Sequence, residues 1–414
     1  MAALLSALVI AACEDEQNAD PVTTKQAEAE RSAEEVEPTG PEIAPVADAK
    51  RPNVVVVYTD DQDTGSVSVM PNVSRLIAEQ GTTFTRAYAS TPQCCPSRAS
   101  FLTGQYAHNH GVLDNIPPRG GFEALDGERT LPVWLEGDGY RTSWLGRYLN
   151  QYGSPASSRP PTEVPPGWTD WHVPVNRTEF QMYDYELNEN GELRRYGAAP
   201  EDYLTDVLAE KARAFVAKSA DAGKPFFLVV APLAPHGEGV LEAIKDPPRD
   251  PRPAPRHDGR FDARELPRPE SFNEPDISDK PPFIAKRPQM SPRALKKLTR
   301  SHRSRLESLL AVDDLVGGVV DELETQDVLD DTIFIYTSDQ GYLLGEHRLK
   351  GKERPYEGAV RVPLIVRGPG FPAGESRLQQ AVSVDLAHTI LAAAGVQPDL
   401  PLDGIDLRQI AGDP

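Results

Sequence analysis

The residues of this chain best suited to chemistry gather in residues 91–104, TPQCCPSRASFLTG. Pro96 suits the first turn of a helix, where its missing N–H costs nothing, and Gly104 suits the end of that helix. This spacing places Cys94 just outside a helix N-terminus, where free N–H groups and the helix dipole favour an anion. Arg98 adds a positive charge about one turn later. We therefore expect Cys94 to act on a negatively charged substrate.

Further polar side chains follow predicted core strands at the points where the strands end. Strands are predicted at 53–58, 140–145, 225–230 and 331–337, and the first is an unbroken apolar run typical of a parallel sheet. The residues that follow these strands are Asp60 and Asp61, Arg147, His236, and Asp339 and Gln340. Ligands bind at the carboxyl edge of such sheets, so we expect these side chains to converge. The adjacent acids Asp60 and Asp61 indicate a bound cation, although an ordinary polar loop is the alternative.

The segment around Cys94 resembles the signature of the sulfatases, in the alkaline-phosphatase-like superfamily. The residues that carry this resemblance are Cys94, Pro96, Ser97, Arg98, Leu102, Thr103 and Gly104. In that family the cysteine is oxidised to formylglycine, whose hydrated aldehyde is the nucleophile. The adjacent Cys95, together with residues 146–150 and 164–171, is similar to the N-acetylglucosamine-6-sulfatase and extracellular heparan 6-sulfatase branch. The alternative for the two cysteines is a pair of buried thiols or a strained disulfide, which so long a motif disfavours.

The resemblance implies hydrolysis of sulfate esters, with 6-O-sulfated glucosamine units of glycans as the substrate. It implies one divalent cation, Ca²⁺, held by oxygen ligands from Asp60, Asp61, Cys94 after its conversion, Asp339 and Gln340. It implies catalytic roles for Cys94, Arg98, Arg147, His236 and Lys352, with Lys352 binding the sulfate and His236 as the acid. Arg147 stands where the branch has a lysine, and it cannot donate a proton. Gln340 stands where the family usually has asparagine or histidine.

Other functions stay open. The same fold and metal would serve a phosphodiesterase or phosphonate monoester hydrolase, and an inactive, tethered glycan-binding protein is the non-enzyme alternative. The net charge of −20 argues against nucleic acid as a partner. Residues 286–305 are markedly basic, which we interpret as a solvated helix face, with a docking strip for a sulfated polysaccharide as the alternative. His108 and His110 are expected to be structural. Conversion of Cys94 would require a formylglycine-generating maturation enzyme as a partner.

The N-terminal region predicts export. Residues 1–12 are an apolar stretch too short to span a bilayer, and residues 10–13 resemble the lipobox of bacterial lipoproteins, with Cys13 as the lipidated residue. An ordinary secretory signal is the alternative. Residues 13–50 hold eleven acidic and three basic residues, which predicts a disordered tether. The protein would then be a bacterial cell-envelope lipoprotein that meets the membrane only through its lipid anchor.

Residues 51–414 are predicted to form the catalytic domain, an α/β fold with a large, mostly parallel central sheet flanked by helices. Helices are predicted at 70–78, 96–102, 130–135, 201–217, 291–324 and 385–394, and residues 246–292 are expected to be irregular. Sulfatases normally continue into a small antiparallel subdomain. We expect that subdomain to be missing or truncated in this chain.

Overall fold

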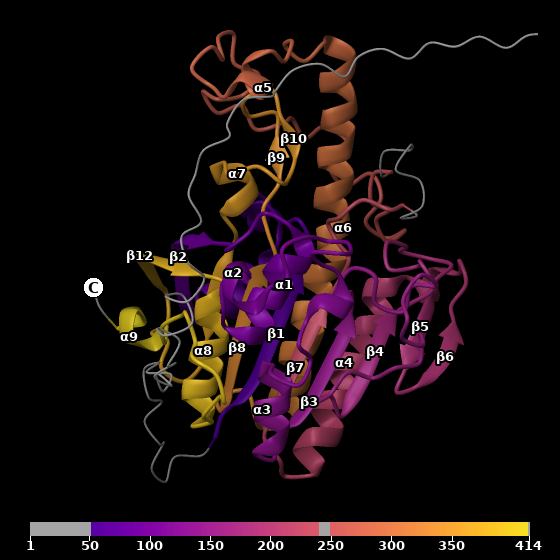
Figure 1. Ribbon diagram of the computed structural model, residues 1–414, viewed down its shortest axis with the longest axis vertical. Coiled ribbons are helices and arrows are strands. Elements are labelled where there is room, and N and C mark those ends of the chain that lie inside the picture. Colours follow the sequence, from indigo (N-terminus) through magenta and orange to yellow (C-terminus); the bar gives the residue numbers. More distant parts are fainter. Residues whose placement is uncertain (1–50, 240–248, 413–414) are drawn as a thin grey trace, which may run out of the picture. The chain divides into compact units, whose positions relative to one another are not determined.

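A computed structural model describes residues 51–239 and 249–412 (Figure 1). The predicted signal peptide, Cys13 and the acidic tether lie outside these described residues. Within the described ranges, no helix has both the length and the apolar character that crossing a bilayer requires.

Ten strands form one mixed sheet in the described part of the chain. They are β1 (Asn53–Thr59), β2 (Gly81–Tyr88), β3 (Arg141–Gly146), β4 (Asp170–Pro174), β5 (Glu186–Glu189), β6 (Glu192–Arg195), β7 (Phe226–Ala231), β8 (Thr332–Ser338), β11 (Leu364–Arg367) and β12 (Glu375–Val382). Their order across the sheet is β12-β2-β11-β8-β1-β7-β3-β4-β5-β6. The five central strands from β8 to β4 are parallel, whereas β11, β5 and β6 are antiparallel to their neighbours. A separate pair joins β9 (Leu343–Leu344) to β10 (Lys350–Gly351).

Strand β1 lies at the centre of the parallel part, and its valines explain why. Val54 to Val57 are fully buried, and β1 pairs in parallel with β7 on one side and β8 on the other. Alternate side chains of a strand point to opposite faces, so Val54 and Val56 enter one core and Val55 and Val57 the other. The prediction of a strand buried on both faces is confirmed.

Helices cover both faces of the sheet (Figure 1). They are α1 (Cys94–Thr103), α2 (Ala107–His110), α3 (Leu131–Gly137), α4 (Leu204–Asp221), α5 (Pro282–Ala285), α6 (Pro292–Thr325), α7 (Glu357–Val360), α8 (Val384–Ala394) and α9 (Arg408–Ala411). Short 3-10 helices span Thr64–Val69, Phe122–Ala124 and Pro200–Asp202, and a π-helix spans Val73–Ala78. Apolar residues of α1, α3 and α8 pack in the first core, and those of α4 and α6 pack in the second. The predicted α/β class with flanking helices is confirmed.

Two predicted helices differ from the structure. The helix predicted at 201–217 begins later, at Leu204, because Pro200 opens a separate 3-10 turn. The helix predicted at 70–78 is a π-helix over Val73–Ala78, and the Asp313 carboxylate of α6 accepts a hydrogen bond from the Val73 N–H. Residues 250–281 contain no named helix or strand, in line with the irregular segment that the sequence predicts there.

Candidate active site

The carboxyl ends of four adjacent parallel strands meet at one place. Asp60 follows β1, Arg147 follows β3, and Asp339 follows β8, each directly after the last strand residue. His236 lies five residues after the end of β7. The predicted convergence of polar side chains at this edge is therefore present in the structure, and α1 brings Cys94 and Arg98 to the same place.

Cys94 lies at the centre of the cluster. Gln93 is the N-cap of α1, so Cys94 is the first residue of the helix and not, as we expected, a residue just outside it. Its Sγ lies 2.8 Å from Lys352 Nζ and 3.2 Å from Gln340 Nε2. Gly104 ends the helix in a left-handed conformation, as the sequence predicts.

Cys94 and Cys95 are both free thiols, so the structure contains no disulfide between them. Burial raises the pKa of Cys94 to about 11, although the positive charge of Lys352 acts in the opposite direction. A thiol with that pKa is protonated at neutral pH, and only a thiolate is a strong nucleophile. The helix N-terminus therefore does not make the unmodified Cys94 thiol reactive.

Arg98 and Arg147 are buried cations that pair with the buried acids. Arg98 Nε lies 2.9 Å from Asp339 Oδ2, and its Nη2 lies 3.2 Å from Asp60 Oδ2. Arg147 Nε lies 3.0 Å from the same oxygen of Asp60. Burial favours a high pKa for Asp60, but the positive charge of Arg147 and its other cationic neighbours lower it well below the usual range. Burial and the negative charge of Asp60 raise the pKa of Asp339 to about 6.

The acids lie close enough to share one metal ion. Ligand atoms of Asp60, Cys94 and Asp339 are all within 4.8 Å of one another, and those of Asp60, Asp61 and His236 form a second such group. Calcium lies about 2.3–2.6 Å from its oxygen ligands, so one ion can bridge oxygens up to about 5 Å apart. These carboxylates therefore suit a hard divalent cation.

Gln340 provides an independent indication of a cation. Its Nε2 donates to Asp61 Oδ1 at 2.6 Å, while its Oε1 is buried without a hydrogen-bond partner among the described residues. Rotating the amide by half a turn would exchange the two atoms and direct Oε1 toward the acids. A buried carbonyl oxygen without a partner is costly unless a cation satisfies it.

Asp61 is held in place by a residue that sequence reasoning missed. Asp61 has a φ of 68°, an uncommon conformation for a residue other than glycine. Arg305 of α6, buried at 3% exposure, donates to the Asp61 carbonyl oxygen and, at 2.9 Å, to that of Pro235. Its guanidinium lies 3.9 Å from the centre of the Tyr342 ring. The basic run at 286–305 contained this residue, but nothing in the run distinguishes a buried arginine from solvated ones.

His236 and Lys352 border the cluster on its open side. His236 Nδ1 is 2.6 Å from the Gly237 carbonyl oxygen, to which it donates, and its Nε2 lies 3.6 Å from Asp61 Oδ2. Burial lowers the pKa of His236, and the charge of Lys352 lowers it further. Lys352 Nζ lies 2.6 Å from Asp61 Oδ1. The nine residues predicted for catalysis and metal binding thus lie together, while the roles assigned to them remain predictions.

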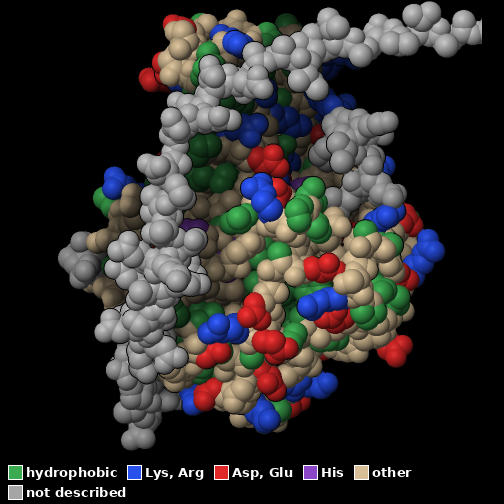
Figure 2. Space-filling view, viewed as in Figure 1, with side chains coloured by type: hydrophobic (Ala, Val, Ile, Leu, Met, Phe, Trp, Pro, Cys, Tyr) green, Lys and Arg blue, Asp and Glu red, His purple; other side chains and the backbone are tan. Residues whose placement is uncertain are grey.

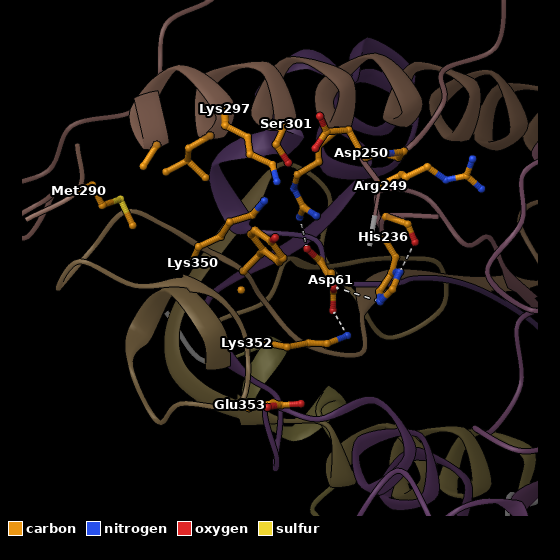
Figure 3. A pocket seen from close by; sticks show the side chains of 17 residues that line it. Asp61, His236, Arg249, Asp250, Met290, Lys297, Ser301, Lys350, Lys352 and Glu353 are labelled. Atoms are coloured by element: carbon orange, nitrogen blue, oxygen red, sulfur yellow. Dashed lines mark hydrogen bonds and ion pairs between the residues drawn. The ribbon is translucent and has the colours of Figure 1, made fainter. Parts of the chain in front are cut away.

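A cavity of about 560 Å³ opens beside this cluster (Figure 3). Asp61, His236 and Lys352 line its inner end. Lys and Arg side chains gather on this face near β10 (Figure 2). A cavity of this size can hold a small carbohydrate next to the buried cations.

His110 lies outside the cluster and has a structural role, as expected. Its Nδ1 accepts a hydrogen bond from the Val112 N–H at 3.1 Å, and its Nε2 lies 3.1 Å from Ser100 Oγ. His108 stacks on the ring of Tyr106.

Comparisons with known proteins identify the family of this chain. A family model described as Sulfatase matches residues 52–396. The human N-acetylglucosamine-6-sulfatase is 35% identical over 374 residues, covering 88% of this chain and 65% of that protein. The extracellular sulfatase SULF-1 homolog of Drosophila melanogaster is 35% identical over 365 residues, covering 86% of this chain and 31% of that protein. This chain thus spans less than two thirds of the length of either relative.

A solved structure shows the same fold. The structure of BT4656 in complex with its substrate D-glucosamine-2-N,6-O-disulfate aligns with a TM-score of 0.71 and 27% identity, and the alignment covers 88% of this chain and 81% of that one. The family model covers most of the described residues, including every residue of the buried cluster. The chain belongs to the sulfatase family.

Proposed function

We propose that this protein hydrolyses sulfate esters and that its substrates are 6-O-sulfated glucosamine units of glycans. The observation that carries the proposal is the arrangement around Cys94, where the buried cations Arg98 and Arg147 and the partly exposed Lys352 surround a position bordered by carboxylates. The human relative is named an N-acetylglucosamine-6-sulfatase, and the substrate named for BT4656 is a glucosamine disulfate. Both names support the choice of sugar.

We propose that Cys94 is converted to formylglycine and that one Ca²⁺ is bound by Asp60, Asp61, Asp339, Gln340 and the converted residue 94. The formylglycine would supply the nucleophilic hydroxyl that the protonated thiol lacks, and the ion would neutralise charge on the sulfate group. The donor atoms are oxygens, which suits calcium better than a softer metal. The buried Oε1 of Gln340 without a partner supports a cation at this position.

The side chains of this chain would bind and orient the sulfate. Arg147 Nη2 donates to Asn150 Oδ1 at 3.0 Å, and its Nε lies 3.0 Å from Asp60 Oδ2 as an ion pair but without hydrogen-bond geometry. Its Nη1 is buried without a hydrogen-bond partner in the described ranges, and we assign it to a sulfate oxygen. Lys352 would contact a second oxygen, and His236 would protonate the leaving oxygen. Positive charges held in place before the reaction lower the cost of charge that develops during it.

We also propose that the protein is exported, with Cys13 as its lipid anchor, residues 13–50 as a tether and residues 51–414 as the catalytic domain. The Drosophila relative is named an extracellular sulfatase, which supports export. A formylglycine-generating maturation enzyme would be its partner before activity appears. The sulfated glycan would be its partner afterwards.

Peptide mass spectrometry of the native protein tests the nucleophile first. We expect the peptide that contains residue 94 to be lighter than its cysteine form, because one oxygen replaces one sulfur and two hydrogens. Sulfate release from glucosamine 6-O-sulfate is then measured with Ca²⁺ and with a chelator. Cys94→Ser should abolish release, whereas Cys95→Ser, a change at the adjacent free thiol, should retain it.

Other results would favour the alternatives. Faster turnover of phosphate diesters or phosphonate monoesters than of sulfate esters would favour a phosphonate hydrolase. An intact Cys94 thiol with no turnover of any ester would contradict the proposal and favour a glycan-binding protein.

A further inference from the structure

One face of α6 turns toward the cavity. Lys297, Ser301 and Arg305 are spaced four residues apart, so they lie along a single side of the helix. All three line the cavity that ends at Asp61, His236 and Lys352. Lys297 is exposed, as the interpretation of the basic run as a solvated helix face predicts, but it also lines the cavity, whereas its neighbour Lys296 does not.

Lys350, from β10, reaches the same cavity from the opposite side. Figure 3 shows the side chains of Lys297 and Lys350 pointing toward each other in the space beyond Asp61. We call these two residues the lysine pair. They belong to elements about fifty residues apart in the chain, so their meeting results from the fold and not from local sequence.

Neither residue of the lysine pair forms a close ion pair in the part of the chain that the structure describes, and Asp250 is the acid whose charge acts most strongly on Lys350. Asp250 also lines the cavity, but its carboxylate is 3.1 Å from Arg300 Nε, which offsets its charge. Glu353 lies beyond Lys352, away from the lysine pair, and Arg249 points away from it (Figure 3). No ion pair joins Lys297 or Lys350 to a carboxylate in residues 51–239 and 249–412.

Two ammonium groups that face each other repel, and although solvent screens part of this repulsion at exposed positions, an anion that lies between them relieves it. Lysine binds sulfate, phosphate and carboxylate groups as a compact point charge. In a chain with a net charge of −20, a local excess of positive charge beside the buried cluster attracts anionic ligands selectively to this cavity.

We propose that the lysine pair is a second anion site, which binds a negatively charged group of the substrate other than the ester that is cleaved. This inference rests on the proposed function and narrows it to glucosamine units that carry a further negative charge. A sulfate on the glucosamine nitrogen and a carboxylate on a neighbouring uronic acid share this chemistry. Both fit a cavity of about 560 Å³.

The test compares three substrates in the mature enzyme: glucosamine 6-O-sulfate, glucosamine 2-N,6-O-disulfate, and a disaccharide of uronic acid and glucosamine 6-O-sulfate. The variant is Lys297→Gln/Lys350→Gln, and the matched control is Lys286→Gln/Lys296→Gln, which removes the same charge from nearby positions outside the cavity. We expect the variant to lower the ratio of kcat/KM for a dianionic substrate over the monosulfate by about 10- to 100-fold, mainly through KM, as the loss of charge-assisted hydrogen bonds predicts.

The pattern of loss identifies the anion. A lowered ratio for the disulfate alone assigns the site to the N-sulfate, a lowered ratio for the disaccharide alone assigns it to the carboxylate, and both together support a shared site. An unchanged ratio for both substrates overturns the proposal, as does an equal loss in the control, which would indicate only general electrostatic attraction.

Binding separates this inference from the proposed function. If the unchanged enzyme hydrolyses none of the three substrates, the proposed function fails. Calorimetry with the disulfate and the disaccharide on Cys94→Ser protein then tests the site without turnover. Binding that weakens at least about tenfold in the added Lys297→Gln/Lys350→Gln background supports the second anion site, and equal affinity overturns it.

Discussion

Replacing Arg98 by methionine should strongly destabilise the metal-free protein. Arg98 has no exposed side-chain surface and bridges Asp60 and Asp339, at 3.2 Å and 2.9 Å. Removing one partner of a buried ion pair costs about 3–5 kcal/mol, because the remaining charge is left uncompensated in a dry environment. Asp60 retains Arg147 at 3.0 Å, so Asp339 bears most of this cost. At about 2 °C per kcal/mol for a large domain, Tm should fall by about 6–10 °C.

Arg256 provides the matched control. It also bridges two acids, with Asp206 at 2.6 Å and Asp314 at 2.9 Å, but its side chain is 43% exposed. Ion pairs in contact with water contribute about 0–1 kcal/mol, so Arg256→Met should lower Tm by about 2 °C at most. Thermal unfolding of both variants followed by circular dichroism in a chelator measures the difference.

Calcium provides a second arm of the same experiment. An ion bound between Asp60 and Asp339 would replace part of the positive charge lost with Arg98. Added Ca²⁺ should therefore raise the Tm of Arg98→Met by more than it raises the Tm of the unchanged protein. If Arg98→Met in chelator is no less stable than Arg256→Met, the reasoning about buried charge is refuted.

Three further predictions concern the metal, pH and the backbone. Gln340→Leu should weaken Ca²⁺ binding at least about tenfold by calorimetry, and unchanged affinity would exclude this residue as a ligand. Burial lowers the pKa of His110 to about 4, whereas the ring in the unfolded chain has a pKa of about 6.5. As the pH falls, the unfolded chain therefore takes up the proton before the folded protein does. The stability that the neutral ring contributes should be complete above about pH 6.5 and should be lost as the pH falls toward 4. Chemical unfolding should show that His110→Gln removes this pH dependence, and an unchanged slope would contradict the assignment. Gly146→Ala should lower the free energy of unfolding by about 1–3 kcal/mol more than Gly139→Ala does. Both positions have a positive φ, but only at Gly146 would the added Cβ meet a backbone oxygen, 2.2 Å away. An equal loss of unfolding free energy in the two variants would contradict this prediction and would show that the backbone at Gly146 shifts to make room for the Cβ.

The buried cluster was predictable where local pattern and chemistry agree. Asp60 and Asp339 each follow a run of β-branched and aromatic residues that can only be a core strand, and the topology of parallel strands brings their ends together. Cys94 was recognisable because a helix start, a cation and a long motif occur in one segment. These features are local in sequence, so no knowledge of distant contacts was needed.

The remaining features depend on distant contacts. Arg305 and Lys297 belong to the same basic run, and only the packing of α6 decides that one is buried beneath Asp61 while the other faces the cavity. The antiparallel insertion of β11 between β2 and β8 has no local signal either, because Leu364–Arg367 is a short apolar strand that could pair in either direction. The start of α1 differed by two residues, Cys94 instead of residue 96, because Gln93 caps the helix without a characteristic side-chain bond.

The burial of Cys94 depends on residues that are synthesised much later than Cys94 itself. Cys94 is 2% exposed in the finished fold, and the atoms nearest its sulfur belong to Gln340 and Lys352, which lie 246 and 258 positions later in the chain. At translation rates of about 5–20 residues per second, those residues leave the ribosome roughly 10–50 s after Cys94 does. During that interval the thiol has none of the cover that they later provide. If an enzyme modifies Cys94, as we propose, the thiol would be most accessible to it in this interval, before Gln340 and Lys352 pack against the sulfur.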